Sequence, residues 1–132
     1  MITKAERADY IHIIRAIQNK KLSYLTCAHV RADIDNGRLY KFVEDGKIIA
    51  ICSILYDNTY QYNALKRLCI FSKKNRGRHI TENFLDYFTQ KFQGKIGCTP
   101  WSDNQPMRHI LEKKGFVLEY IFSEKWCFYS RS

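Results

Sequence analysis

Residues 68–88 read LCIFSKKNRGRHITENFLDYF, and three patterns follow one another within them. Leu68–Phe71 is an uninterrupted apolar run of the kind that forms a buried strand. A basic loop comes next, from Lys73 to Arg78. Apolar side chains then recur at the spacing of one helical face: Ile80, Phe84, Leu85, Phe88 and Phe92. The stretch therefore predicts a strand, a basic turn and an amphipathic helix in succession.

A basic loop that opens a helix is suited to bind phosphate. The first amides of a helix have no partner inside it, and the helix dipole places partial positive charge at the same end. Arg76, Gly77 and Arg78 lie at this junction, shortly after Lys73 and Lys74. Neither a GxxxxGK loop nor a GxGxxG turn is present. One hypothesis is a pyrophosphate cradle of another type, and the alternative is a solvated basic turn.

Toward the N-terminus, the pattern predicts helices first and strands afterwards. Thr3-Lys4-Ala5-Glu6 has the residue types of a capping box at a helix start. Asp45-Gly46 indicates a type I′ hairpin. The expected elements are an edge strand at Met1 and Ile2, a helix to about Asn19, a helix over Ala28–Ile34 closed by Asn36-Gly37, and strands over Leu39–Glu44, Ile48–Tyr56 and Tyr60–Phe71.

Toward the C-terminus, strands and helices alternate, and Gly94 is the expected end of the helix that begins at Ile80. The further elements are strands over Lys95–Thr99, Phe116–Phe122 and Lys125–Tyr129, and a helix over Asn104–Lys114 with Pro106 in its first turn. The predicted order is β-α-α-β-β-β-α-β-α-β-β, an α/β (α+β) fold with a mixed, mainly antiparallel central sheet flanked by helices. A chain of 132 residues is expected to form one domain, over residues 1–132.

Composition narrows the classes of function. The apolar fraction of 45% is typical of a packed globule, and no apolar run is long enough to span a membrane. The N-terminus lacks the apolar core of a signal peptide, so a cytoplasmic location and no membrane partner are expected. Five cysteines without a CxxC pair indicate neither a metal site nor disulfides. The net charge of +9, concentrated between Asp57 and Glu82, favours a polyanionic partner.

A second motif, NQPMRHILEKKGF over residues 104–116, places an asparagine eleven residues before a glycine. A helix N-cap and a helix C-cap explain Asn104 and Gly115 without any ligand. The order of elements, the Arg76-Gly77-Arg78 turn and this second motif together resemble the GNAT superfamily of N-acetyltransferases, over most of the chain. The resemblance implies an acyl-CoA N-acyltransferase fold with acetyl-CoA as co-substrate and no metal. It also implies direct attack by a primary amine in a ternary complex, the amine belonging to a small molecule, a protein N-terminus or a lysine.

The resemblance also implies which residues hold the cofactor. In the family the loop reads R-G-x-G-x-G/A, and aligning Arg76 with its arginine places His79 and Thr81 on two glycine positions. A second register makes Gly77 the key glycine but misplaces Phe84-Leu85. Loop amides would hold the pyrophosphate, the strand would hold the pantetheine and face the thioester carbonyl, and the asparagine would contact the pantetheine arm. The residues so implied are Cys69, Ile70, Phe71, Arg76, Gly77, Arg78, His79, Ile80, Thr81 and Asn104.

No general acid or base can be assigned from this sequence. The tyrosine that usually serves as acid in the family corresponds to Leu111, and a glutamate base used by several branches corresponds to Thr99. The expected strand over Tyr60–Phe71 carries no carboxylate. A water chain is the alternative base, and the side chains that could anchor it, or act themselves, are Asp57, Tyr60, Tyr62, Cys127 and Tyr129.

Two other functions stay open at this point. A non-catalytic GNAT-fold module would bind CoA or another anion without turnover, consistent with the missing acid and base. Alternatively, the +9 charge would contact RNA in an acetyltransferase that acts on a tRNA-linked or ribosomal amine. Acceptor choice in such a domain lies in Leu22–Gly37 and in the C-terminal hairpin, which carry no motif. Both a monomer and a homodimer are compatible with the sequence.

Overall fold

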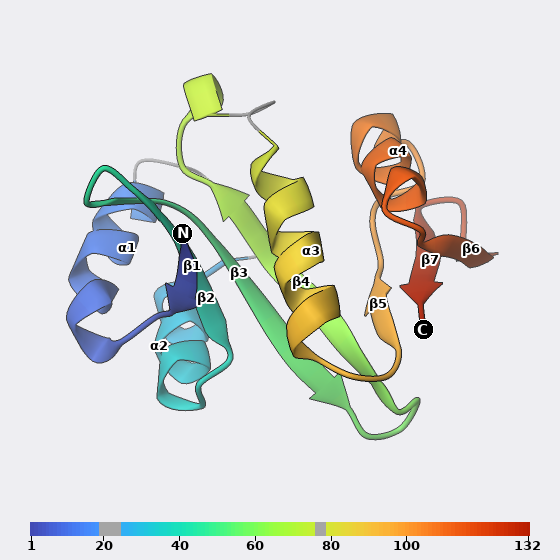
Figure 1. Cartoon of the computed structure of the whole chain (residues 1–132), viewed down its shortest axis with the longest axis horizontal. Coiled ribbons are helices and arrows are strands. Elements are labelled where there is room, and N and C mark those ends of the chain that lie inside the picture. Colours follow the sequence, from blue (N-terminus) through green and yellow to red (C-terminus); the bar gives the residue numbers. More distant parts are fainter. Residues whose placement is uncertain (19–24, 76–78) are drawn as a thin grey trace. The chain divides into compact units, whose positions relative to one another are not determined.

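The computed structural model describes residues 1–18, 25–75 and 79–132, and its elements follow the predicted order (Figure 1). Short 3-10 turns over Arg7–Asp9 and Lys73–Asn75 are added to it. The bounds are β1 Ile2–Lys4, α1 Tyr10–Gln18, α2 Cys27–Asp35, β2 Leu39–Glu44, β3 Lys47–Asp57, β4 Tyr62–Ile70, α3 Ile80–Lys91, β5 Ile96–Cys98, α4 Gln105–Lys113, β6 Val117–Phe122 and β7 Trp126–Arg131. The predicted fold class is confirmed.

The strands form one seven-stranded sheet in the order β1-β2-β3-β4-β5-β7-β6. The pairs β1–β2, β2–β3, β5–β7 and β6–β7 are antiparallel, whereas β4 and β5 are parallel. Parallel neighbours need a crossover connection, and α3 provides it, as predicted. The sheet is therefore mixed and mainly antiparallel.

Two compact units make up the chain, and each is described separately below. The first, called the N-terminal unit, comprises residues 1–54 and 67–80, and the second, the C-terminal unit, comprises residues 55–66 and 81–132. Strands β3 and β4 have residues in both units. That residues 1–132 form one domain stays a prediction.

The N-terminal unit is built on the buried face of its two helices. Figure 1 shows α1 and α2 side by side, next to β1 and β2. Ile13, Ile14 and Ile17 of α1 point inward at helical spacing, together with Val30 and Ile34 of α2. The buried cluster consists of Ala5, Ile13, Ile14, Ile17, Leu25, Val30, Ile34, Leu39, Ile51 and Cys69.

The predicted start of the first helix was wrong by several residues. Thr3 does not cap a helix, because it lies in β1 opposite Lys41 of β2. The chain turns instead at Glu6, whose amide donates to Asp9 Oδ2 over 2.8 Å, and the 3-10 turn then leads into α1. Three residues of strand pairing outweighed the local capping pattern. The edge strand predicted at Met1 and Ile2 is confirmed, shifted by one residue.

Two predicted turns are confirmed by backbone conformation. Asp45 and Gly46, between β2 and β3, have φ values of 51° and 74°. Both central residues of a type I′ turn need positive φ, so this hairpin is of the expected type. Gly37 has a φ of 67° directly after α2, where a left-handed residue ends a helix.

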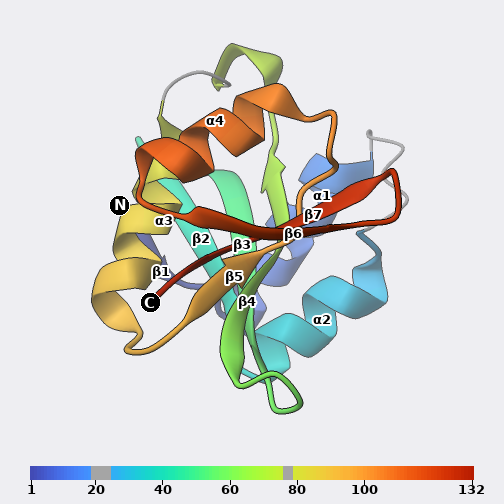
Figure 2. The same cartoon turned by 90° about the vertical axis from the view of Figure 1, so that its right-hand side faces the viewer.

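The C-terminal unit places helices beside the strands β5, β7 and β6. Figure 2 shows α4 lying along β6 and β7. Ion pairs join the C-terminal end of α4 to α3: Nζ of Lys113, the last residue of α4, lies 2.8 Å from Glu82 Oε1, and Nζ of Lys114, the C-cap, lies 3.0 Å from Asp86 Oδ2. No helix within the described ranges is long and apolar enough to cross a membrane.

Candidate functional site

The end of β4 is the first part of the candidate site, and it belongs to the N-terminal unit. The Phe71 amide donates to the carbonyl oxygen of Ile49, on β3, over 2.9 Å. Backbone groups of successive strand residues point to opposite edges, so the amide and carbonyl of Ile70 point away from β3. Cys69 buries its side chain in the core. Of the three predicted strand residues, Ile70 therefore presents its backbone away from β3, and the Phe71 amide is committed to the sheet.

The turn after β4 supplies the second part. Lys73, Lys74 and Asn75 form a 3-10 turn in which the Asn75 amide donates to the Ser72 carbonyl over 3.0 Å. Asn75 is buried, which its place in a basic loop did not suggest. Arg76, Gly77 and Arg78, predicted to line the phosphate cradle, lie outside the described residues. Their role stays a prediction.

His79 has a backbone conformation that is unusual for a residue with a side chain. Its φ is 61°, in the left-handed region that glycine adopts readily and other residues seldom do. A left-handed residue with a side chain costs about 1 kcal/mol, and histidine is among the side chains that tolerate it better. The helix α3 begins at the next residue, Ile80, whose side chain is buried, and Thr81 is half-buried in its first turn. The chain thus has glycine-like backbone geometry at His79 without a glycine.

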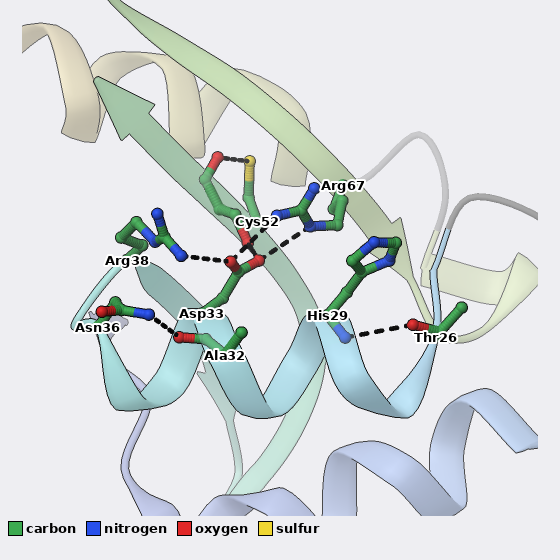
Figure 3. A network of polar contacts seen from close by, with 9 residues as sticks. Thr26, His29, Ala32, Asp33, Asn36, Arg38, Cys52 and Arg67 are labelled. Atoms are coloured by element: carbon green, nitrogen blue, oxygen red, sulfur yellow. Dashed lines mark hydrogen bonds and ion pairs between the residues drawn. The ribbon is translucent and has the colours of Figure 1, made fainter. Parts of the chain in front are cut away.

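A buried carboxylate, which the sequence did not single out, lies at the centre of the N-terminal unit. Asp33 of α2 is 1% exposed. Its Oδ2 accepts from Ser53 Oγ over 2.6 Å and from Arg67 Nε over 2.9 Å, and its Oδ1 accepts from Arg67 Nη2 over 3.0 Å. Arg38 Nη2 lies 3.6 Å from the same Oδ1. Figure 3 shows Asp33 between the two arginines. Asp33, Ser53, Arg67 and Arg38 are called the Asp33 network below.

The Asp33 network keeps a buried charge ionised. Burial alone raises the pKa of a carboxyl, because it penalises the charged form. Hydrogen bonds from Arg67 and Ser53, with the charges of Arg67 and Arg38, outweigh that penalty and lower the pKa of Asp33 below its usual value. Asp33 is therefore an anion matched by two cations, inside the unit that contains the end of β4.

Arg67 is unusual in its backbone as well as in its side chain. It lies within β4, and its φ is 55°. The other described residues with side chains and positive φ, namely Asp45, Gln61, His79 and Ser123, lie in turns or before a helix. A left-handed residue inside a strand bends it and resets which way the following groups point, as in a β-bulge. The segment Leu68–Ile70 thus follows a bend at Arg67.

Asn104, in the C-terminal unit, acts as the N-cap of α4. Its Oδ1 accepts from the Met107 amide over 3.2 Å, and the residue is exposed. Gly115, eleven residues later, has a φ of 86° after the end of the helix. These roles explain both residues of the motif structurally. The cap uses only the side-chain oxygen of Asn104, and the side-chain nitrogen, which can only donate, takes no part in it.

The positions of the expected acid and its substitutes are also clear in the C-terminal unit. Leu111 is fully buried and cannot move a proton. Tyr129 is buried too, its hydroxyl donating to Glu112 Oε2 over 2.8 Å and accepting from Arg108 Nε over 3.0 Å. Burial raises the pKa of Tyr129, with Glu112 adding to the shift and Arg108 opposing it. The Cys127 thiol lies against the Pro100 carbonyl at 3.7 Å. Packing explains Tyr129 and Cys127.

The residues considered as anchors of a water chain differ in exposure. Tyr60 is largely exposed, and its amide donates to Asp57 Oδ1 over 2.9 Å. Tyr62 is half-buried, and burial, together with the charge of Asp57, raises its pKa.

Burial also decides the state of Cys98, on β5, because it raises the pKa of the thiol to about 12. The thiol is therefore no nucleophile at neutral pH. Within residues 1–18, 25–75 and 79–132, no three His, Cys, Asp or Glu side chains are grouped as metal ligands.

Comparison with known proteins supports the fold through solved structures. No protein-family model matches the sequence, and the comparison with curated proteins found no match. Solved structures match over nearly the whole chain. A GNAT-family acetyltransferase from Bacillus cereus has a TM-score of 0.85 at 19% identity, covering 100% of this chain and 96% of its own. The chain has the fold of the GNAT acetyltransferases, and the resemblance stated from the sequence is confirmed in its fold.

Two further structures of the same fold carry functional information in their names. Naa50 from Arabidopsis thaliana, in complex with the bisubstrate analogue CoA-Ac-MVNAL, has a TM-score of 0.77 at 12% identity, covering 100% of this chain and 97% of its own. The ribosomal-protein-S18-alanine N-acetyltransferase from Escherichia coli has a TM-score of 0.72 at 12% identity, covering 98% and 91%. These names describe those proteins.

The Asp33 network should make stability sensitive to acid. The folded pKa of Asp33 lies below the value of about 3.9 in an unfolded chain, so its contribution is complete above that value and is lost as pH falls through the folded pKa. We expect Asp33→Asn to lower the free energy of unfolding by about 3 kcal/mol at pH 7, because two guanidinium groups lose their charged partner.

The difference between wild type and Asp33→Asn, measured by urea unfolding from pH 7 to pH 3, should shrink toward the acid end. Asp35→Asn is the control, because Asp35 lies on the same helix but in an exposed ion pair with Arg7. A difference that stays constant over this range would contradict the assignment of Asp33 as the titrating group.

Proposed function

We propose that this chain is a GNAT-type N-acetyltransferase that moves acetyl from acetyl-CoA to a primary amine. The observation that supports the proposal most strongly is the likeness of the whole chain to GNAT acetyltransferases, with a TM-score of 0.85. The glycine-like backbone of His79, at a glycine position of the family loop, adds a local argument.

Acetyl-CoA would be held mainly by backbone groups. The pantetheine would run along Cys69, Ile70 and Phe71, with Ile70 offering the groups that point away from β3. The pyrophosphate would meet the first amides of α3, at Ile80 and Thr81, beside His79 and the basic residues Arg76 and Arg78 with Gly77 between them. Asn104 would donate from its amide nitrogen to the pantetheine arm while its oxygen caps α4. No metal is needed for this chemistry.

The reaction needs little from side chains once the two substrates are placed. The amine loses a proton and attacks the thioester carbon, the C–S bond breaks, and the thiolate leaves with its electron pair and takes up a proton. Backbone amides can polarise the carbonyl oxygen in the transition state. Leu111 and Thr99 occupy the positions of the family acid and base, so water would carry the protons. The expected consequence is a slow enzyme rather than an inactive one.

The acceptor is a primary amine of a small molecule, a protein N-terminus or a lysine. Two neighbours carry peptide or protein acceptors in their names: CoA joined to an acetylated peptide in one, and a ribosomal protein in the other. With a net charge of +9, this chain would also tolerate an acceptor on tRNA or the ribosome. We further propose that it works in the cytoplasm as a monomer or a homodimer.

Binding of acetyl-CoA is the first test. We expect millimolar acetyl-CoA to raise the melting temperature, because a ligand that binds only the folded state stabilises it. Arg76→Glu should abolish the shift by repelling the pyrophosphate. Lys47→Glu, the same charge change in the exposed β2–β3 hairpin, is the control and should leave it intact. The absence of any shift in the wild type would refute the proposal.

Turnover separates the enzyme from its alternative, a module that binds CoA or another anion without reacting. We expect thiol release from acetyl-CoA when primary amines are supplied as a mixture of a peptide with a free N-terminus, spermidine and lysine methyl ester. The rate should exceed that without amines, because the acetyl group needs an acceptor. A thermal shift without amine-dependent thiol release would favour the module, as the missing acid and base would allow.

Restoring the family glycine tests the position of His79. We expect His79→Gly to tighten acetyl-CoA binding, because glycine keeps the left-handed backbone and lets phosphate approach it closely. Ser123→Gly is a matched control, since Ser123 has a similar φ of 55° in the β6–β7 turn. Titration calorimetry should show tighter binding for His79→Gly only. Weaker binding would indicate that the imidazole itself contacts the phosphate.

A further inference from the structure

The Asp33 network joins three elements of the N-terminal unit at one carboxylate. Asp33 comes from α2, Ser53 from β3 and Arg67 from β4, and the hydrogen bonds among them measure 2.6 to 3.0 Å. Asp33 and Ser53 are almost fully buried, and the Arg67 side chain is 17% exposed. The contact is therefore internal, and its geometry is bidentate, with two parallel N–H···O bonds from one guanidinium.

Stability alone is a poor explanation for such a pair. A buried ion pair pays a large desolvation cost, and apolar residues of similar size often stabilise a core equally well or better. What the bidentate pair adds is direction, because the planar guanidinium fixes the orientation of both partners. Here the arginine that is held is the left-handed residue inside β4. A strained backbone conformation persists only where the surrounding structure determines it, and the Asp33 carboxylate does so at Arg67.

The bend at Arg67 lies directly before the strand segment that the proposed cofactor site uses. Arg67 directly precedes Leu68–Ile70, the strand segment that would face the thioester and pantetheine. After the bend, Cys69 points into the core and the Phe71 amide reaches Ile49, which sets the direction of the Ile70 backbone between them. The carboxylate that holds the bend comes from α2, which lies in the Leu22–Gly37 segment expected to choose the acceptor.

We infer that Asp33 and Arg67 are positioning residues: from α2 they set the direction of the Leu68–Ile70 backbone, so that the acceptor-side helix and the thioester-holding strand keep one geometry. The inference rests on the proposed function for its catalytic meaning, whereas the positioning itself is a property of the fold. The role assigned to both side chains is indirect, through the backbone that follows Arg67. A rigid alignment of this kind matters because displacements of about 1 Å can cost on the order of 100-fold in rate.

Hydrogen exchange tests the positioning without any ligand. We expect the amides of Leu68, Cys69 and Ile70 to exchange at least ~10-fold faster in Asp33→Asn and Arg67→Lys, because the bend loses its bidentate partner. Asp9→Asn is the matched control: Asp9 and Lys41 form a 2.7 Å ion pair in the same unit, with side chains 15% and 17% exposed, away from β4. Equal exchange in all three variants, at matched loss of melting temperature, would overturn the inference.

Kinetics test its catalytic meaning, with acetyl-CoA and the amine mixture named above. We expect Arg67→Lys to lower kcat on the order of 100-fold and to change KM for acetyl-CoA much less. The thioester would be presented wrongly, whereas the proposed cofactor contacts at Arg76–Thr81 and Asn104 lie outside the displaced segment. Asp9→Asn should keep kcat. Arg67→Gly separates the side chain from the backbone, because glycine adopts a φ of 55° without strain. Full activity of Arg67→Gly would overturn the inference.

Failure of the proposed function and failure of the positioning role would give different results. If the wild type neither binds nor turns over acetyl-CoA, the proposed function fails, and the exchange measurement alone still decides whether the Asp33 network positions Leu68–Ile70. If the wild type is active and the folded Arg67→Lys protein has unchanged kcat, the function stands and the positioning role fails. Circular dichroism at the assay temperature confirms that each compared variant is folded.

Discussion

A carboxylate that is 1% exposed can remain ionised only if its surroundings replace the water it has lost. Asp33 meets this condition through one hydroxyl and one bidentate guanidinium, with a second arginine 3.6 Å away. Arg67 needs Asp33 in the same way, because without the carboxylate it would be a partly desolvated cation inside a strand. Neither residue can shift without leaving the other's charge uncompensated, which is costly in a medium of low dielectric constant. These bonds tie α2 to β3 and β4 within the N-terminal unit.

Strand β4 shows how a single segment can serve two kinds of pairing. Its first residues, Asn63 to Leu65, pair in parallel with Ile96 to Cys98 of β5 in the C-terminal unit. On its other edge β4 neighbours β3, and just after β4 the Phe71 amide bonds to Ile49 of β3. A bend between two such stretches changes which edge of the strand each backbone group faces. The bond from Phe71 to Ile49 directs the backbone groups of Ile70 away from β3, which is the feature that the proposed cofactor site uses.

Sequence reasoning succeeded where the signal was local or periodic. The element order, the type I′ hairpin at Asp45-Gly46 and the crossover helix beginning at Ile80 were all predictable, because turn chemistry and apolar spacing determine them. The capping box at Thr3 failed since strand pairing with Lys41 competed for the same residues. The Asp33 network was out of reach for a different reason. An aspartate beside Val30 and Ile34 signals a carboxylate on a buried helical face, but partners 20 and 34 residues away leave no spacing rule to find them.

The fold is recognisable although its sequence signals are weak, because the features that define it belong to the backbone. A site made of strand and helix amides depends on backbone geometry, and backbone geometry tolerates many side chains. His79 shows this directly, since a residue with a side chain keeps a φ of 61° there, in the region that glycine adopts readily. Leu111 is buried and apolar, so its side chain cannot act as an acid. In this chain, the buried ion pair between Asp33 and Arg67 lies directly before Leu68–Ile70, the backbone segment on which the proposed site depends.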